Sequence, residues 1–439
     1  MLVNICKNIV NDIPGEQLRF LFQPLNEKQK KTLSNLFPLN LPIDLLLTFP
    51  LDEVYWKRKC CDKQWTHLNY WLSNCSWKNT FVSCSVVDII DSFITGKSSF
   101  AEVKTSLFKF QNYLYVLKIN GFKFNYSNNN HKYLPIEDFV FQLVSLFPNL
   151  KEIYLNNFPL NYEMLLESND CDLSVNNYEM LSKTLGKIQN LEKFNLLGTK
   201  MEKFQFSCII DSLTALNTLT DVDLSCNLIT DDFCDSISKL LNSQLEVLKL
   251  SNNQITNSGV KTIIDALSNN KSLKILHLDH NSIGDEGAIN IFQCLISNIS
   301  LFSIDLAYNK FTTECELSLC KLLERNSALQ HLNLTGNNLE QETGWKIYKA
   351  VQSNRRILYL GFQFCGFSSE TEDLIHLQIS QNHQNSCQGE LNCVDYNSAT
   401  FSLSVTFGTD FFARNLFPHV AISPPTKFGG ISVDRSSSE

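Results

Sequence analysis

The sequence predicts an α/β solenoid in which short strands and helices alternate, preceded by a small helical N-terminal domain. Leucine takes the first, fourth and sixth positions of "LEVLKLSNNQI", which begins at Leu245, and asparagine takes the ninth. The same spacing returns in "LKILHLDHNSI", "LFSIDLAYNKF" and "LQHLNLTGNNL". Each copy is followed by a segment with helical spacing of its apolar residues, such as "SGVKTIIDALSNN". The repeating unit is therefore a strand, a turn and a helix.

Each strand comes from the "LxL" part of the repeat, whose leucines point into the solenoid while alternate side chains point out. The register runs from Leu191 to Ile357 in six steps, five of 28 residues and one of 26. Repeats of this length with a full helix resemble the ribonuclease-inhibitor type of leucine-rich repeat. That type forms a horseshoe with strands on the concave face and helices on the convex face.

An asparagine follows five of these strands, and we expect these side chains to stack as a ladder. Their amides pair with main-chain groups that the turns leave free, so their role is structural. The members are Asn227, Asn253, Asn281, Asn309 and Asn337.

Two weaker repeats begin at Leu114 and Leu150, and polar insertions at 125–132 and 167–177 interrupt them. We therefore expect a helical, tryptophan-rich domain at 1–105 and a repeat domain at 106–384, regular from about 191. The tail at 385–439 has no sustained period and is expected to be mostly disordered.

The composition excludes several classes of protein. A net charge of −8 argues against general binding to nucleic acid or anionic lipid. No apolar stretch reaches the roughly 18 residues that a membrane span needs, and no export signal opens the chain. The fifteen cysteines are odd in number and contain no CxxC pair. We expect a cytoplasmic protein with reduced thiols.

The outward strand positions form the default binding face. The predicted protein-binding residues are Asp221, Asp223, Lys249, His277, Asp279, Asp305, His331 and Asn333. His277 and Asp305 occupy one column, but no Ser or Cys nucleophile shares it, so a solvated ion pair is expected there. We predict no catalytic residue, no cofactor, no metal ion and no small-molecule substrate. The cysteine cluster Cys60, Cys61, Cys75 and Cys84 lacks the paired spacing of a zinc site.

The front of the chain allows two functional interpretations. "LPIDLLL" from Leu41, followed by Trp56, Trp65, Trp71 and Trp77, resembles the layout of an F-box. That resemblance implies a substrate receptor of a ubiquitin ligase, in which the repeats hold the substrate. The other interpretation is a helical domain whose aromatic residues form its own core and its contact with the first repeat.

A wider resemblance covers roughly residues 40–385. "LPIDLLL", "YWKR", "CC" and "SWK" precede two degenerate repeats with insertions and then five regular repeats. This layout resembles the subunit 5 family of the nexin-dynein regulatory complex, the T-complex-associated testis-expressed proteins. The resemblance implies a non-enzymatic scaffold of the axoneme in motile cilia and flagella, where it binds other subunits of that complex and axonemal proteins and regulates dynein-driven motility.

Overall fold

The structure is a computed structural model that describes residues 39, 43–48, 51–65, 76–94, 97–120, 143–156, 182–199 and 201–388. The chain divides into two compact units, Met1–Asn382 and His383–Glu439. The elements below belong to the first unit, except for the end of the last helix. The tail that we expect to be disordered lies outside the described residues from 389 onward.

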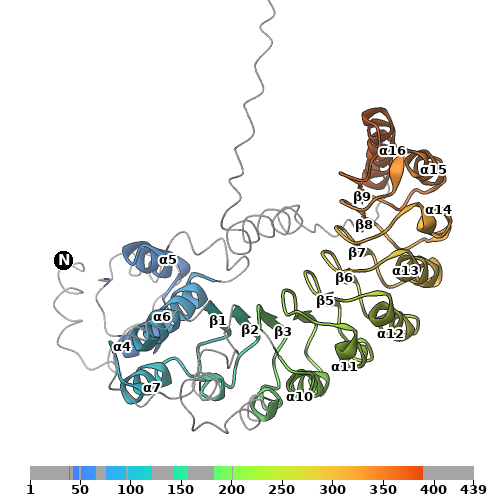
Figure 1. Cartoon of the computed structure of the whole chain (residues 1–439). Helices are drawn as coiled ribbons and strands as arrows, with labels where there is room; N and C mark the ends of the chain where they lie inside the picture. Colours follow the sequence, from blue (N-terminus) through green and yellow to red (C-terminus); the bar gives the residue numbers. More distant parts are fainter. Residues whose placement is uncertain are drawn as a thin grey trace, which may run out of the picture. The chain divides into compact units, whose positions relative to one another are not determined.

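The described strands form one parallel sheet in which each strand pairs with its neighbours in sequence (Figure 1). In the short strands of the regular repeats the middle residue, such as Leu248 or Leu276, is buried between two outward side chains. This is the pattern that the "LxL" spacing predicts. The strands are β1 (Val116–Asn120), β2 (Glu152–Asn156), β3 (Lys193–Leu197), β4 (Asp221–Asp223), β5 (Val247–Lys249), β6 (Ile275–His277), β7 (Ser303–Asp305), β8 (His331–Asn333) and β9 (Tyr359–Gly361).

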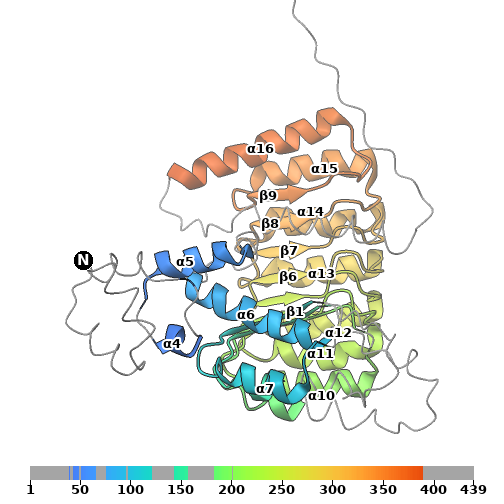
Figure 2. The same cartoon turned by 90° about the vertical axis from the view of Figure 1, so that its left-hand side faces the viewer.

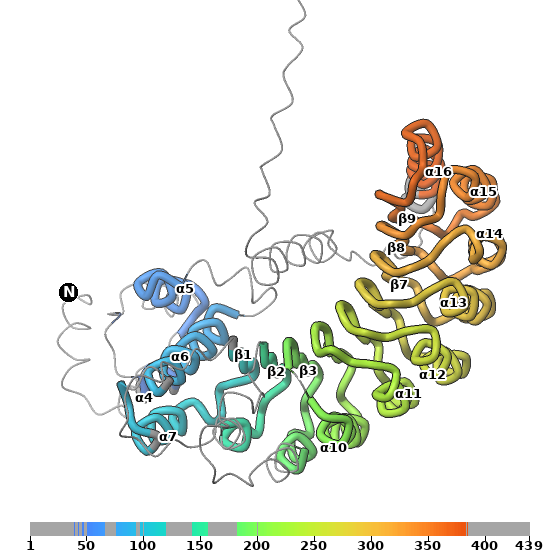
Figure 3. Tube along the Cα trace, viewed as in Figure 1, coloured from blue at the N-terminus to red at the C-terminus, as the bar shows by residue number. Residues whose placement is uncertain are grey.

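The helices of the repeats lie side by side along the outer edge of an arc, and the strands line its inner edge (Figures 1 and 3). Seen from the side, the later helices and strands stack in layers (Figure 2). Helix α12 buries Val260, Ile263, Ile264 and Leu267 on one face, as its spacing predicts. The predicted repeat solenoid is thereby confirmed. The helices are α10 (Lys203–Thr214), α11 (Cys234–Leu241), α12 (Asn257–Leu267), α13 (Asp285–Ser297), α14 (Glu316–Arg325), α15 (Glu340–Ser353) and α16 (Ser369–Gln388), with 3-10 turns η3 (Asp231–Phe233) and η4 (Thr313–Cys315).

The predicted asparagine ladder is present. Asn281 is buried, and its Nδ2 donates to the carbonyl oxygens of Leu250 at 2.9 Å and Leu278 at 3.0 Å. Its Oδ1 accepts from the backbone N–H of Ile255 at 3.1 Å. The ladder ends at Cys365, whose thiol donates to a carbonyl oxygen of the preceding repeat. Each side chain thus joins two consecutive turns.

Replacing Asn281 by alanine should lower the free energy of unfolding by about 1–3 kcal/mol, because buried carbonyl and N–H groups lose their partner. Chemical denaturation measures this change. Asn269→Ala is the matched control, since Asn269 is exposed in a loop, and it should change stability by less than about 0.5 kcal/mol. Equal stability of the two variants would contradict the structural role of the ladder.

A second asparagine ladder, which we did not predict, closes the helical side of the repeats. Asn326 Nδ2 donates to the carbonyl oxygen of Asn298 at 3.1 Å, and its Oδ1 accepts from the backbone N–H groups of Ala328 and Leu329. These bonds cap the end of one helix and fix the entry into the next strand. The ladder consists of Asn270, Asn298, Asn326, Asn354 and Asn382.

The N-terminal helices are α4 (Ile43–Thr48), α5 (Glu53–Asp62), α6 (Trp77–Ile94) and α7 (Phe100–Phe108). Trp56 is buried, and its ring centroid lies 5.3 Å from that of Phe81. Ser83 in α6 donates a hydrogen bond to the Val116 carbonyl oxygen in β1 at 3.0 Å. These contacts agree with aromatic residues that form a core next to the first repeat, while Trp71 lies outside the described residues.

The predicted domain boundaries at 105 and 384 both fall within helices, α7 and α16. They stay predictions.

The ten cysteines whose side chains the structure describes are free thiols. Burial is the main cause that raises the pKa of Cys234 and of Cys315 to about 12. Such thiols are poor nucleophiles and poor metal ligands at neutral pH. Cys75 of the predicted cluster lies outside the described residues.

In the described part of the chain, no helix has the length and apolar character that a membrane span requires.

Candidate functional site on the concave face

The strand register arranges the outward side chains of the concave face in columns. One column, which we call the central column, contains Asn195, Asp223, Lys249, His277, Asp305 and Asn333. His277 lies directly opposite Asp305, as predicted. Asp221 and His331 belong to the neighbouring column, and Asp279 follows β6 on the concave side. Regular repeats thereby bring residues far apart in sequence onto one surface.

Hydrogen bonds between side chains fix the two ends of the central column. Asn195 Nδ2 donates to Asp223 Oδ2 at 3.1 Å. Asn333 Nδ2 donates to Asp305 Oδ2 at 3.0 Å, and the backbone N–H of Ala307 donates to Asp305 Oδ1 at 3.0 Å. These carboxylates are therefore held in defined orientations.

His277, Asp279 and Asp305 form the most crowded part of this face. One potential ligand atom from each lies within 4.8 Å of the other two. Asp305 is only 3% exposed and Asp279 9% exposed. Our expectation of a solvated ion pair between His277 and Asp305 is therefore wrong. Strands about 4.8 Å apart let neighbouring side chains cover one another, and the concave side draws them closer together.

Burial dominates the ionisation of this cluster. Burial and the nearby Asp279 raise the pKa of the Asp305 carboxyl to about 7. Burial, together with the charge of Lys249, lowers the pKa of His277 to about 4. Burial acts to raise the pKa of Asp279, but hydrogen bonds from His280 and Ser251 outweigh it and lower that pKa. At neutral pH His277 is therefore neutral and Asp279 is ionised.

The shifts of Asp305 and His277 have opposite effects on stability. The folded state binds more protons at Asp305 between its ordinary pKa of 3.8 and about 7, so this group lowers stability as pH rises. The unfolded state binds more protons at His277 between about 4 and its ordinary pKa of 6.5, so this group raises stability as pH rises. The two slopes oppose each other between about pH 4 and 6.5.

Single substitutions should separate these slopes. His277→Gln removes the rising contribution, so its free energy of unfolding should fall relative to wild type from about pH 4 to 6.5. Asp305→Asn removes the falling contribution, so its free energy of unfolding should rise relative to wild type over the same range. Each change should be at most about 1.4 kcal/mol per pH unit. Denaturation curves across this pH range measure both. Variants whose pH profiles parallel that of wild type would show that these residues have ordinary pKa values in the folded protein.

Two ring pairs lie beside the cluster. The rings of His280 and Tyr308 stack with centroids 4.5 Å apart, and those of His331 and Tyr359 with centroids 6.2 Å apart. We did not predict a role for His280, although it directly precedes ladder residue Asn281. His280 has a left-handed backbone, with φ of 54°, and this turn directs its ring toward Asp279, 3.0 Å from the imidazole Nδ1.

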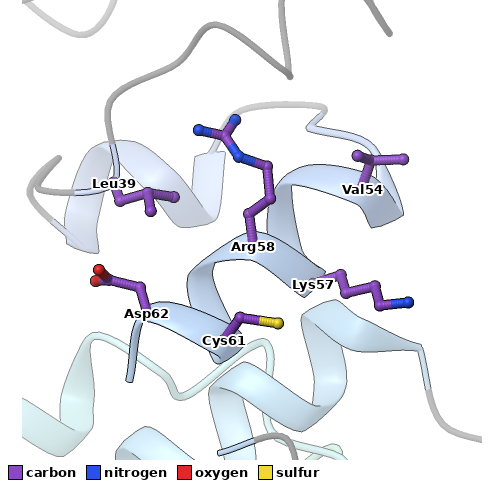
Figure 4. Close-up of a pocket in the computed structure, with 6 residues that line it drawn as sticks. All are labelled: Leu39, Val54, Lys57, Arg58, Cys61 and Asp62. Atoms are coloured by element: carbon purple, nitrogen blue, oxygen red, sulfur yellow. The ribbon is translucent and has the colours of Figure 1, made fainter. Parts of the chain in front are cut away.

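A separate hollow lies on the N-terminal helices. It is lined by Leu39, Val54, Lys57, Arg58, Cys61 and Asp62 (Figure 4). Figure 4 shows Lys57 and Arg58 extending in different directions from α5. The hollow is open and of mixed charge, and its side chains do not converge on one point. It is therefore a weaker candidate than the concave face.

Comparison with protein families agrees with the repeat register. A family model described as Leucine Rich repeat matches residues 241–263 and 269–292. Among solved structures, the leiomodin-1 actin-binding site 2 aligns with a TM-score of 0.30 and 23% identity, covering 32% of this chain and 83% of that one. The tropomodulin C-terminal domain of Caenorhabditis elegans aligns with a TM-score of 0.31 and 16% identity, covering 35% and 94%.

Two curated proteins match a longer stretch. The chain is 30% identical over 252 residues to the mouse (Mus musculus) protein named dynein regulatory complex subunit 5, which covers 52% of this chain and 47% of that protein. It is 26% identical over 261 residues to the Macaca fascicularis protein of the same name, which covers 55% and 51%. The match thus spans about half the length of these relatives. The chain is a leucine-rich repeat protein with sequence similarity to dynein regulatory complex subunit 5, which confirms the resemblance that its motifs indicated.

Proposed function

We propose that this chain is a non-enzymatic scaffold of the dynein regulatory complex in the axoneme of motile cilia and flagella. It regulates dynein-driven motility by holding a neighbouring protein on its concave face. The proposal rests on one observation, a charged central column on a repeat solenoid that resembles subunit 5 of that complex. Curved repeat proteins commonly use such a concave surface for binding.

The accessible part of the concave face indicates the chemistry of the partner. Asp221 and Asp223 are partly exposed on β4, and Lys249 lies opposite Asp223 on the neighbouring strand β5. Charged groups at a surface of this kind determine association rate and specificity when the partner carries complementary charge. A partner that complements this surface would be another complex subunit with a basic segment facing Asp221 and Asp223 on β4. The same subunit would have an acidic group facing Lys249.

Purification of the tagged chain from ciliated cells tests this function. We expect other dynein regulatory complex subunits to copurify, and immunolocalisation to place the protein along the axoneme. Recovery of a ubiquitin-ligase adaptor in equal amount, without those subunits, would contradict the scaffold and favour the F-box interpretation.

The described part of the F-box-like segment does not favour that alternative. An adaptor needs leucines that are free to contact it, whereas Leu46 and Leu47 of "LPIDLLL" are buried in the core. Their burial is the result expected of a structural domain.

A further inference from the structure

We propose that His277, Asp279 and Asp305 bind a divalent transition-metal ion of zinc-like chemistry on the concave face. Among the described residues, these three form the one group of His, Cys, Asp or Glu side chains whose ligand atoms converge in this way. The proposal concerns a site that neither the repeat fold nor the scaffold function requires, so it stands or fails independently of both.

The backbone brings the three donors together. His277 and Asp305 are opposite each other on the paired strands β6 and β7. Asp279 follows His277 by two residues. A zinc ion with bonds of about 2.1 Å in tetrahedral geometry places its ligand atoms about 3.4 Å apart. The ligand atoms of these three residues lie within 4.8 Å of one another. Side-chain rotation therefore has to shorten each distance between two ligand atoms by at most about 1.4 Å.

Groups outside the three residues orient both carboxylates. Each carboxylate oxygen already accepts one hydrogen bond and keeps a second lone pair for a metal ion. Outer partners of this kind fix the ligands of protein metal sites and raise their affinity. The donors are Ser251 Oγ and His280 Nδ1 to Asp279, at 2.5 and 3.0 Å, and the Ala307 N–H and Asn333 Nδ2 to Asp305, each at 3.0 Å.

The charge balance of the cluster favours a cation. Two carboxylates lie side by side in an almost fully buried position, and within the described ranges no lysine or arginine makes an ion pair with either. Adjacent buried charges of one sign are unfavourable unless a cation or a proton compensates them. A divalent ion between two carboxylates and a neutral imidazole gives a neutral site. His277 and His280 are partly accessible, so the ion can enter from the concave surface.

The donor set selects the class of metal. Imidazole nitrogen favours zinc, cobalt and their neighbours over calcium and magnesium, which prefer oxygen ligands alone. Three protein ligands leave a fourth position on a tetrahedral ion for water or for a side chain of a bound partner.

Calorimetric titration of the metal-free full chain with Zn2+ tests the proposal. We expect one equivalent to bind and to raise the melting temperature, while Mg2+ and Ca2+ do not. His277→Gln and Asp305→Asn should each weaken this binding by roughly 100-fold or more. His331→Gln and Asp221→Asn are matched controls in the neighbouring column and should bind as wild type does. Circular dichroism establishes that each variant is folded.

Cobalt provides a second readout that separates this site from the cysteines. Bound Co2+ should show the visible bands of nitrogen and oxygen ligation without a thiolate charge-transfer band. A thiolate band, unchanged zinc affinity in folded His277→Gln, or no zinc binding by the wild type would each overturn the proposal.

Discussion

Replacing Asp221 and Asp223 by lysine should release the protein from detergent-extracted axonemes without unfolding it. Both side chains are partly exposed on β4. Their reversal would place like charges against the proposed basic partner and should cost several kcal/mol of binding free energy, which corresponds to more than about 100-fold in affinity. Immunoblots of the axonemal and soluble fractions measure retention. Asp305 is unsuitable for this test, because it is buried and a lysine there would disturb the fold.

The matched control reverses the same number of charges on the convex side. Asp265→Lys with Glu324→Lys changes exposed residues of α12 and α14, and we expect normal retention. The thermal melts of both double variants should stay close to that of wild type. If the β4 variant were retained normally, or if the α12 and α14 variant were lost from the axoneme, the binding surface would lie away from the concave face.

Replacing Phe292 by alanine should destabilise the repeats by about 3–5 kcal/mol. Phe292 in α13 is fully buried and packs edge to face on Phe311, with ring centroids 6.2 Å apart. The substitution removes a large apolar side chain from the core that joins two repeats. In a solenoid each repeat is stabilised mainly by its neighbours, so the loss also weakens the adjoining repeats. Chemical denaturation measures the change.

Phe204→Ala is the control for this substitution. Phe204 in α10 is 54% exposed, so the same truncation should cost less than about 0.5 kcal/mol. If both variants lost equal stability, α13 would not face the core as the repeat register requires.

Periodicity made the fold readable from the sequence. A leucine spacing that returns every 28 residues determines which side chain is buried in each strand and which asparagine reaches back to the preceding turn, as Leu276 and Asn281 show. The central column follows from the same register, because equivalent positions of parallel strands become neighbours. The opposition of His277 and Asp305 was therefore predictable.

Other features depend on spatial neighbours that the repeat pattern does not specify. The burial of Asp279 and Asp305 arises from side chains of adjacent strands, and strand alternation alone assigns these aspartates to an open face. His280 joins the cluster because its left-handed turn aims the ring back toward Asp279. The second asparagine ladder did carry a signal, a step of 28 residues from Asn298 to Asn326, at helix ends where polar residues are common.

Lysine-specific cross-linking of intact axonemes, followed by mass spectrometry, tests most directly whether the concave face holds a dynein regulatory complex partner. Lys249 and Lys193 belong to concave strands β5 and β3, whereas Lys261 and Lys321 are exposed on convex helices α12 and α14. We predict cross-links from Lys249 and Lys193 to another subunit of that complex. Cross-links to such subunits from Lys261 and Lys321 alone would contradict binding on the concave face.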